Sequence, residues 1–358
     1  MTNPFTSTTF RLGDHRATAR GPALRREESP AGGPVWVIAD NDLARRAIND
    51  RRITKDTAFA PAHWRTWENG LEPPGGQQPS LTTLDGEEHL RLRRAHTPLF
   101  TARRLREHTG RMAELARTLL GAAGPDLAAD FTMRYPLSVI CHVLGVPAEH
   151  LDAVTAALRG MTTGTGEDIW RGTVELTRLT ATALHVPDSG AAELRSRLPA
   201  DLTDEQVGYL LFGLVMAGQI TTEATLGFLI AHHLAGHQGD TDDETFVRDV
   251  VRRHSPAPFT LWRFTTEEIE LDGQTLPPRS PVLAHIQGIN DAGDDLTFGA
   301  GAHYCVGAQL AQLELVTLLR ILRTDFPAAR LEMPFDELPV HQAGVNGVRL
   351  TRLPVTLR

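Results

Sequence analysis

A single long apolar stretch, residues 203–236, limits what this chain can fold into more than any other feature. Apolar residues recur in it at helical spacing, and Thr203 can cap its start with Gln206 as the capping-box partner. At 1.5 Å per residue such a helix would be roughly 50 Å long, so we expect it to run through the middle of the molecule. Gly213 and Gly218 each cost about 1 kcal/mol in a helix interior, which predicts a close approach or a local distortion there.

The rest of the sequence reads mainly as helix, with strand signals only near the ends. A short apolar run at 35–38 follows glycine and proline, and residues 268–276 predict a hairpin around Asp272-Gly273. Residues 57–80 predict a long surface loop, of the kind that is often functional. No repeat or low-complexity linker divides the sequence, so we expect one domain over 1–358, mainly α with small β-sheets. Further helices are predicted at 105–123, 244–254 and 307–325.

Composition and charge exclude several classes of function. The net charge is −8, so duplex nucleic acid is a poor partner. No window approaches roughly eighteen uninterrupted apolar residues, and the N-terminus lacks the basic and apolar regions of a secretory signal. Cys141 and Cys305 are the only cysteines, which excludes a disulfide framework and a four-cysteine zinc site. These traits predict a cytoplasmic protein without a membrane or nucleic-acid partner.

One glycine-rich segment carries the strongest chemical signal. It reads Phe298-Gly-Ala-Gly301-Ala-His303-Tyr-Cys305-Val-Gly307 and leads directly into a predicted helix. A cysteine at a helix N-terminus has its thiolate stabilised by the positive end of the helix dipole and by free N–H groups. Gly301 and Gly307 allow positive φ angles and the close approach of a flat group, and Phe298 can shield the sulfur. This pattern is typical of a thiolate that binds a metal.

Other functions of Cys305 stay open on the residues alone. A buried structural cysteine is the ordinary interpretation of a lone cysteine at a helix start. A nucleophilic cysteine needs a positioned base, for which His303 is a candidate. Zinc is disfavoured because no second cysteine lies nearby in the sequence.

The same loop resembles the heme-binding loop of the cytochrome P-450 family, and the resemblance covers nearly the whole chain. It implies the cytochrome P-450 fold, with heme b between the long central helix and the helix after the cysteine loop, and Cys305 as the ligand of the iron. The further matching segments are Pro34-Val-Trp36-Val-Ile, Asp85-Gly-Glu-Glu-His89-Leu-Arg-Leu-Arg93-Arg94, Tyr135-Pro-Leu-Ser-Val-Ile-Cys141-His-Val-Leu-Gly145-Val-Pro147, Ala217-Gly218-Gln-Ile220-Thr221-Thr222 and Arg349-Leu-Thr-Arg-Leu-Pro354-Val355.

The resemblance also implies roles for individual residues. Two heme propionates need cations or hydrogen-bond donors, and the implied ones are His89, Arg93, Arg263 and His303. The other residues implied to bind the heme are Phe298, Gly307, Ala217 and Gly218, while Thr221 is the implied catalytic residue. Ordinary alternatives stay open for these side chains: a solvated face for Arg93, a pair with Glu267 or Glu268 for Arg263, and a bond to its own i−4 carbonyl for Thr221.

One departure from the family pattern bears on the reaction. Ile220 stands where many members carry an acid that relays protons together with the following threonine, and isoleucine cannot relay a proton. Glu223 lies nearly one turn further along and is a weak substitute.

Two more departures lie behind the cysteine loop. The family carries a Glu-x-x-Arg pair that braces this region, and here Asp249 replaces the glutamate. A pair between Asp249 and Arg252 at i, i+3 can still form, and a simple pair on the helix surface is the ordinary alternative. Between Asn290 and Phe298 only residues 291–297 intervene, where members usually have a longer irregular stretch.

From the resemblance we expect a heme-thiolate monooxygenase, a monomer that hydroxylates a small-molecule, carrier-linked or peptide-linked intermediate of secondary metabolism. Electrons would come from a ferredoxin and its reductase. The acidic ferredoxin would dock on a basic face formed by Arg91, Arg94, Arg103, Arg104 and Arg106. Ile220 favours an alternative, namely oxidative coupling, cyclisation, desaturation or peroxide-driven chemistry. A non-catalytic recruitment module of the same fold is the third hypothesis. The candidates for the substrate pocket are Trp64, Trp67, Met216, Ile220, Phe259 and Leu261.

Overall fold

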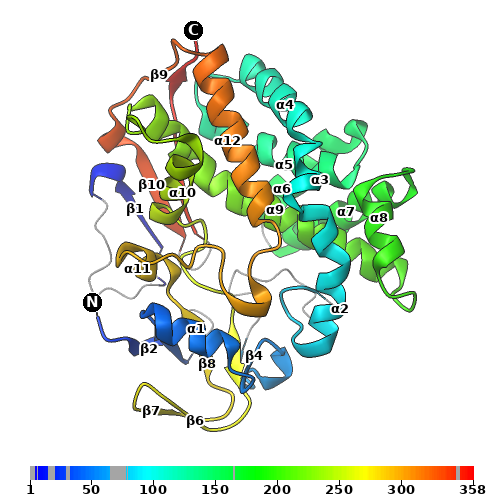
Figure 1. Ribbon diagram of the computed structural model, residues 1–358, viewed down its shortest axis with the longest axis vertical. Coiled ribbons are helices and arrows are strands. Elements are labelled where there is room, and N and C mark those ends of the chain that lie inside the picture. Colours follow the sequence, from blue (N-terminus) through cyan, green and yellow to red (C-terminus); the bar gives the residue numbers. More distant parts are fainter. Residues whose placement is uncertain are drawn as a thin grey trace.

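A 31-residue helix, α9 (Asp204–Leu234), runs through the helical part of the structure (Figure 1). Helices α5, α7, α10 and α12 all pack against it. The structure is a computed structural model that describes residues 5, 7–14, 21–29, 33–64, 78, 80–163, 166–343 and 347–358. The other helices are α1 (Asn41–Asn49), α2 (Gly86–His96), α3 (Ala102–Arg106), α4 (Thr109–Ala122), α5 (Phe131–Leu144), α6 (Leu151–Thr163), α7 (Gly166–Ala181), α8 (Gly190–Arg197), α10 (Asp243–Arg253), α11 (Ile286–Asp291) and α12 (Ala308–Asp325).

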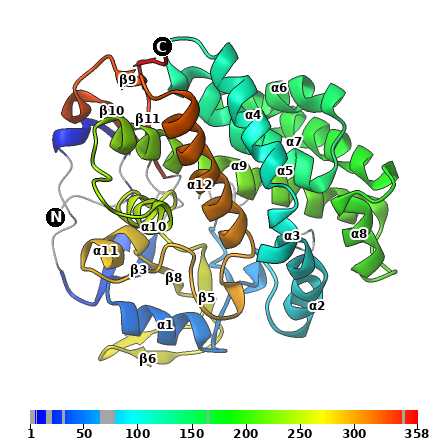
Figure 2. The same ribbon diagram turned by 45° about the horizontal axis from the view of Figure 1, so that its top comes forward.

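The strands form small sheets on the side of the N-terminus, while α4 to α8 lie on the other side (Figure 2). The largest sheet has the order β2-β3-β8-β5-β4, and the others are β1-β10-β11, β12-β9 and β6-β7. The expected fold, mainly α with small sheets, is therefore confirmed. The strands are β1 (Ser7–Arg11), β2 (Leu24–Glu28), β3 (Pro34–Ile38), β4 (Ile53–Thr54), β5 (Arg263–Thr265), β6 (Ile269–Leu271), β7 (Gln274–Leu276), β8 (Pro281–Ala284), β9 (Arg330–Leu331), β10 (Pro339–Ala343), β11 (Val348–Leu350) and β12 (Val355–Thr356).

Local sequence signals explain where several of these elements begin and end. The capping box at the start of α9 is present: the Gln206 N–H donates to Thr203 Oγ1 at 3.2 Å, and the Thr203 N–H donates to Gln206 Oε1 at 2.9 Å. The predicted hairpin is β6–β7, and Asp272 and Gly273 in its turn both have positive φ, as a type I′ turn requires.

Helix α9 is buried in the core for most of its length. Among the described residues it is the one helix long and apolar enough to cross a membrane, but 67% of that window is buried inside the fold. An apolar helix covered by other helices in this way is the core helix of a globular fold.

The two glycines in the middle of α9 differ in their surroundings. A Cβ atom at Gly218 would lie 3.2 Å from Ile140 Cγ1 on α5, so the close approach expected here is confirmed. A Cβ atom at Gly213 would meet nothing within 4 Å, so the same expectation is wrong for Gly213.

This difference predicts opposite effects of two alanine substitutions in one helix. Gly213→Ala should raise the free energy of unfolding by about 1 kcal/mol, because alanine favours the helix and its methyl group meets no neighbour. Gly218→Ala should lack this gain, because its methyl group must displace Ile140. Denaturant unfolding of both variants beside wild type measures the difference, and equal gains would contradict the assignment.

A buried carboxyl group joins α12 to α9. Glu314 on α12 is 2% exposed, and its side chain forms a hydrogen bond with Thr222 of α9. Its backbone carbonyl accepts a hydrogen bond from the Tyr135 hydroxyl of α5 at 3.1 Å. Burial raises the pKa of Glu314 well above its ordinary value of 4.5, although the bond to Thr222 acts to lower it. Burial therefore favours the neutral, protonated form of this side chain.

The raised pKa of Glu314 gives stability a defined pH dependence. The folded state holds this proton at pH values where the unfolded chain has released it, so the contribution is complete below pH 4.5 and is lost as pH rises towards the folded pKa. Glu314→Gln keeps the shape of the neutral acid and cannot titrate. Unfolding measured from pH 4 to 8 should show the stability of wild type falling relative to this variant as pH rises. Parallel curves for the two proteins would refute a raised pKa.

Candidate functional site

The cysteine loop holds Cys305 immediately before α12. The Cys305 N–H donates to the Phe298 carbonyl at 2.8 Å, which closes the loop, and Gly307 forms the N-cap of α12. Burial raises the pKa of the Cys305 thiol, whereas the N–H groups of Gly307 and Ala308 and the charge of Arg93 act to lower it. Cys305 is nonetheless an exposed residue. Two amide donors aimed at an accessible sulfur are what a thiolate ligand requires.

The glycines of the loop serve two different purposes. Gly301 has φ +64°, and a Cβ atom there would lie 2.3 Å from Asn49 Oδ1 of α1, so both reasons for glycine apply. Gly307 has φ −87°, so it does not use the positive φ that a glycine allows. A Cβ atom at Gly307 would lie 3.9 Å from the sulfur of Cys305, within ordinary contact distance. Phe298 is partly buried and packs against the main core, with its ring 6.3 Å from that of Tyr304.

Two histidines meet beside the loop. The ring of His89 on α2 lies 4.0 Å from the ring of His303, centroid to centroid. His303 Nε2 is 2.7 Å from Asp85 Oδ1, while Asp85 Oδ2 accepts bonds from the Lys55 N–H at 2.5 Å and the Thr54 hydroxyl at 2.8 Å. Burial acts to raise the pKa of Asp85, but these bonds and the charge of His303 outweigh it and hold the pKa well below its usual value. Burial lowers the pKa of His89 to about 4 and also lowers that of His303.

Asp85 contacts the candidate site through His303, and the sequence analysis missed this contact. It occupies the N-cap position of α2, where aspartate is ordinarily read as a helix cap. In the structure its side chain makes no capping bond and instead orients His303.

The two arginines of the predicted set lie at the same place. Arg93 is four residues after His89 on α2 and is partly buried. Its positive charge acts to lower the pKa of Cys305. Arg263 on β5 is 6% exposed, and burial lowers its pKa. The described residues provide it no ion pair with Glu267 or Glu268, so that alternative is wrong. The structure therefore brings all four predicted propionate ligands together around the cysteine loop.

Two polar atoms in this cluster test whether a heme fits. His89 Nε2 and Arg263 Nε are buried and have no hydrogen-bond partner among the described residues. Leaving such donors unsatisfied costs roughly 1–3 kcal/mol each. Two carboxylates beside them would satisfy both, so the donor set fits the propionates of a heme whose iron is bound by Cys305.

One face of α9 borders open space. Ala217 and Thr221, four residues apart, are exposed although most neighbours on this helix are buried. The Thr221 hydroxyl donates to the Ala217 carbonyl at 2.7 Å, which is the ordinary helical alternative for this residue. Glu223 accepts from Gln219 Nε2 at 2.5 Å. A separation of two residues along a helix corresponds to a rotation of about 200°, so Glu223 lies on the side of α9 opposite Thr221. It therefore cannot substitute for the acid that is missing at Ile220.

The predicted substrate-pocket residues have different surroundings in the structure. Met216 and Ile220 are partly buried on α9, and Leu261 is partly buried before β5. Phe259 is 1% exposed and packs with Phe5 and His285, so its expected place in the pocket is contradicted. Trp64 packs on Trp262 with ring centroids 4.5 Å apart, which makes it part of a local aromatic cluster. Trp67 lies outside the described residues.

Of the two possibilities for Asp249, the structure shows the surface pair and not the pair with Arg252. Asp249 lies 3.9 Å from Arg253 instead, and both of these side chains are about half exposed. The Arg252 guanidinium donates to the Asn290 carbonyl at 2.7 Å. Asp249, which is shorter than glutamate, does not hold Arg252, and the guanidinium of Arg252 binds Asn290 of α11 instead.

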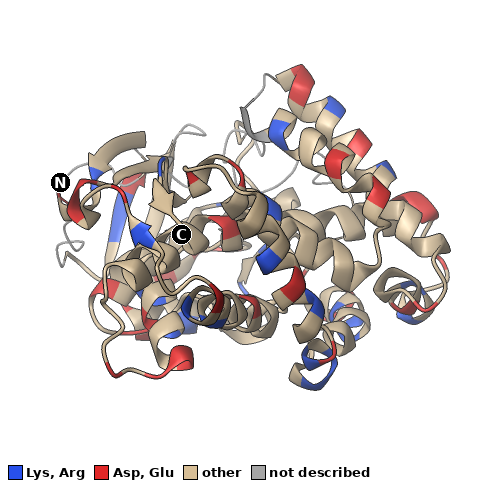
Figure 3. Ribbon diagram, turned by 90° about the horizontal axis from the view of Figure 1, so that it is seen from above, with Lys and Arg blue, Asp and Glu red and all other residues tan. Residues whose placement is uncertain are grey.

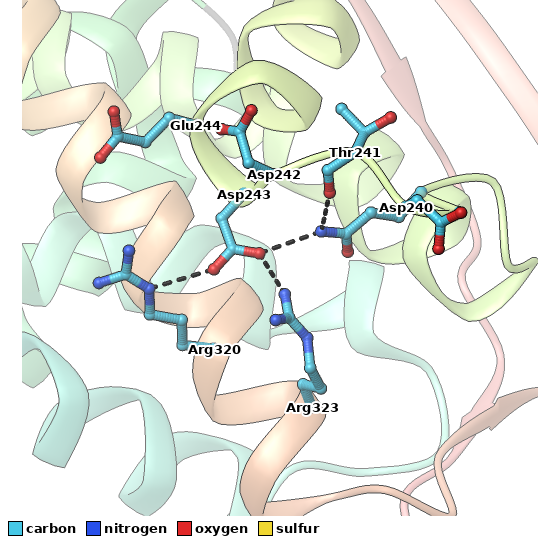
Figure 4. Close-up of a pocket in the computed structure, with 9 residues that line it drawn as sticks. Asp240, Thr241, Asp242, Asp243, Glu244, Arg320 and Arg323 are labelled. Atoms are coloured by element: carbon cyan, nitrogen blue, oxygen red, sulfur yellow. Dashed lines mark hydrogen bonds and ion pairs between the residues drawn. The ribbon is translucent and has the colours of Figure 1, made fainter.

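A pocket of about 580 Å³ lies apart from this site, at the turn between α9 and α10 and against α12 (Figure 4). Asp243 bridges it, accepting from Arg320 Nε at 3.1 Å and Gln238 Nε2 at 3.0 Å and pairing with Arg323. Its lining includes none of the predicted site residues. Because its arginines are already paired with Asp243, the pocket is a surface ion-pair network.

Comparisons with known proteins place the whole chain in one family. No protein-family model matches the chain. The cytochrome P-450 monooxygenase DoxA of Streptomyces peucetius subsp. caesius is 39% identical over 388 residues, which cover 94% of this chain and 92% of that protein. The cytochrome P450 monooxygenase PikC of Streptomyces venezuelae is 28% identical over 90% of this chain and 85% of its own length. Among solved structures, CYP154C4 from Streptomyces sp. W2061 is 25% identical with a TM-score of 0.78, over 94% of this chain and 92% of that one. The chain therefore belongs to the cytochrome P450 monooxygenases, whose cofactor is heme b.

Proposed function

We propose that this enzyme hydroxylates a small-molecule, carrier-linked or peptide-linked intermediate of bacterial secondary metabolism, using O2 and electrons from a ferredoxin. The observation that carries the proposal is the accessible sulfur of Cys305, with the amide groups of Gly307 and Ala308 directed at it and the charge of Arg93 nearby. Similar enzymes carry names such as mycinamicin IV hydroxylase/epoxidase and nocardicin C N-oxygenase. Those names support a substrate drawn from secondary metabolism.

The residues around the loop have separate tasks. When bound, heme supplies an iron that activates oxygen, and a thiolate ligand favours this chemistry by donating electron density. Cys305 would hold the iron, and its two amide donors would moderate the charge on the sulfur. The propionates would be held by His89, Arg93, Arg263 and His303. Ala217 would allow close approach to the ring, whereas a Cβ atom at Gly218 would point at Ile140 of α5. Thr221 would present its hydroxyl to bound substrate or water.

A basic surface beside the site supports a ferredoxin as the electron donor. Arg94, Arg103 and Arg106 are exposed, and none of them has an acidic partner among the described residues. By contrast, Arg91 lies 3.5 Å from Asp201, and Arg104 pairs with Glu107 at 2.6 Å. On the other outer helices, charges of both signs are interleaved (Figure 3). Unpaired arginines on α2 and α3, beside the candidate site, would attract an acidic ferredoxin. We place the enzyme in the cytoplasm as a monomer, where such donors are reduced.

The first test is the optical spectrum of the purified protein, reduced under carbon monoxide, beside Cys305→Ser. Wild type should show the Soret shift of a thiolate-bound heme, and the variant should lose it because serine provides no thiolate. Heme without that band in wild type would contradict ligation by Cys305. A protein that takes up no heme would sink the enzymatic proposal and leave the recruitment module.

A second candidate function rests on the surroundings of Thr221. Ile220 cannot relay a proton, Glu223 lies on the opposite side of α9, and the Thr221 hydroxyl is bonded to Ala217. Oxidative coupling, cyclisation and desaturation need not complete oxygen insertion, and a peroxide-driven reaction bypasses the reduction of O2 for which protons must be delivered. These observations favour such chemistry if hydroxylation with O2 proves poor.

The substitution Ile220→Asp separates the two candidates. Natural-product intermediates are first screened for a substrate-induced spectral shift, and product formed per electron is then measured with ferredoxin and O2. If the reaction is hydroxylation, an acid beside Thr221 should raise this yield by about tenfold or more. Turnover with hydrogen peroxide should not change, because peroxide already carries its protons. A wild type that turns over only with peroxide, or whose product gains no oxygen atom, would favour the second candidate.

A further inference from the structure

The amide side chain of Asn290 lies between α10 and the cysteine loop. Asn290 is the last but one residue of α11 and is fully buried, with 0% exposure. Its Nδ2 group donates to the Arg252 carbonyl at 3.0 Å and to Thr297 Oγ1 at 2.8 Å. Its Oδ1 atom accepts from the Leu296 N–H at 2.9 Å. Both hydrogens of the amide nitrogen and the carbonyl oxygen therefore have partners.

Asn290 and Arg252 bind each other in both directions. The Arg252 guanidinium donates to the Asn290 carbonyl at 2.7 Å, while the Asn290 amide donates to the Arg252 carbonyl. Asp249, the residue expected to hold Arg252, lies 3.9 Å from Arg253 and is 43% exposed. Such a half-exposed contact contributes little to stability.

From Asn290 the contacts continue directly into the loop. Leu296 and Thr297, which Asn290 holds, immediately precede Phe298. The Leu296 carbonyl accepts from the Gly299 N–H at 2.8 Å, and the Phe298 carbonyl accepts from the Cys305 N–H at 2.8 Å. Only residues 291–297 connect Asn290 to Phe298, so this short segment transmits the position of Asn290 to the sulfur of Cys305.

We propose that Asn290 is the positioning residue of the thiolate loop, and that it performs in this chain the bracing task that the Glu-x-x-Arg acid performs elsewhere in the family. The proposal rests on the proposed function in one respect, namely that Cys305 binds heme. A buried amide that satisfies three partners at fixed distances restricts the loop more than an exposed carboxylate does. It also accounts for an intact cysteine loop behind a connection of seven residues, 291–297.

Gln287 provides a matched control on the same helix. It is 8% exposed, accepts from the Ser255 N–H at 3.0 Å, and donates to the Arg253 carbonyl at 2.9 Å and to Asp291 at 2.7 Å. It therefore joins α10 to α11 as Asn290 does, but none of its hydrogen bonds reaches the loop. A merely structural role for Asn290 would make the two residues equivalent.

The experiment compares Asn290→Ala, Gln287→Ala and Asp249→Ala with wild type as purified holoenzymes. The readouts are the reduced carbon monoxide spectrum, the reduction potential, the rate of heme transfer to apomyoglobin and the midpoint of thermal unfolding. For Asn290→Ala we expect most molecules to lose the thiolate-type band, faster heme loss, and a more negative potential in molecules that keep the band, because weaker N–H···S bonds leave more charge on the sulfur. Gln287→Ala should lower only the unfolding midpoint, and Asp249→Ala should resemble wild type in all four.

Two conservative variants keep the proposal testable if Asn290→Ala does not fold. Asn290→Asp retains the acceptor for the Leu296 N–H but removes both donors, and Thr297→Val removes a single acceptor. Both should shift the spectrum in the same direction, by less than alanine. A normal spectrum and potential in all Asn290 and Thr297 variants, or loss of the band in Asp249→Ala, would overturn the proposal. Absence of a thiolate-type band in wild type would instead overturn the proposed function.

Discussion

The candidate site depends on one backbone hydrogen bond, from the Cys305 N–H to the Phe298 carbonyl. This bond folds the loop back so that the amides of Gly307 and Ala308 reach the sulfur at the start of α12. The rest of the structure fixes the two ends of that bond. Glu314 and Tyr135 hold α12 against α9 and α5, and the α10–α11 contact holds the segment before Phe298. The sulfur therefore takes its position from helices that are far apart in the sequence.

The site also contains polar groups that the protein alone does not satisfy. His89 Nε2 and Arg263 Nε are buried without a partner among the described residues, while Asp85 and His303 are bonded to each other. Burying an unsatisfied donor costs free energy, so the chain gives up stability to keep these donors available. A ligand that binds the folded state and satisfies them returns that stability. Heme is accordingly part of the fold energetics as well as of the chemistry.

Features with local causes could be predicted from the sequence, whereas features that depend on tertiary packing could not. The capping box of α9, the Asp272-Gly273 turn and the cysteine loop are each specified by neighbouring residues. The side chain of Phe259 is buried because Phe5 and His285 cover it, which no local pattern indicates. Asp249 loses Arg252 because α11 offers the arginine a better acceptor. The local sequence suggests that Asp85 caps a helix, but in the structure its side chain contacts His303 instead.

The contact between Gly301 and Asn49 has a consequence for how sequences of this type can change. The side chain of Asn49 occupies the space that any Cβ atom at residue 301 would need, and the positive φ of Gly301 disfavours other residues independently. Shortening residue 49 would relieve only the first constraint, so a single substitution at either position does not free the other. Asn49 of α1 can therefore be shortened on its own, while residue 301 of the cysteine loop stays a glycine whatever stands at position 49.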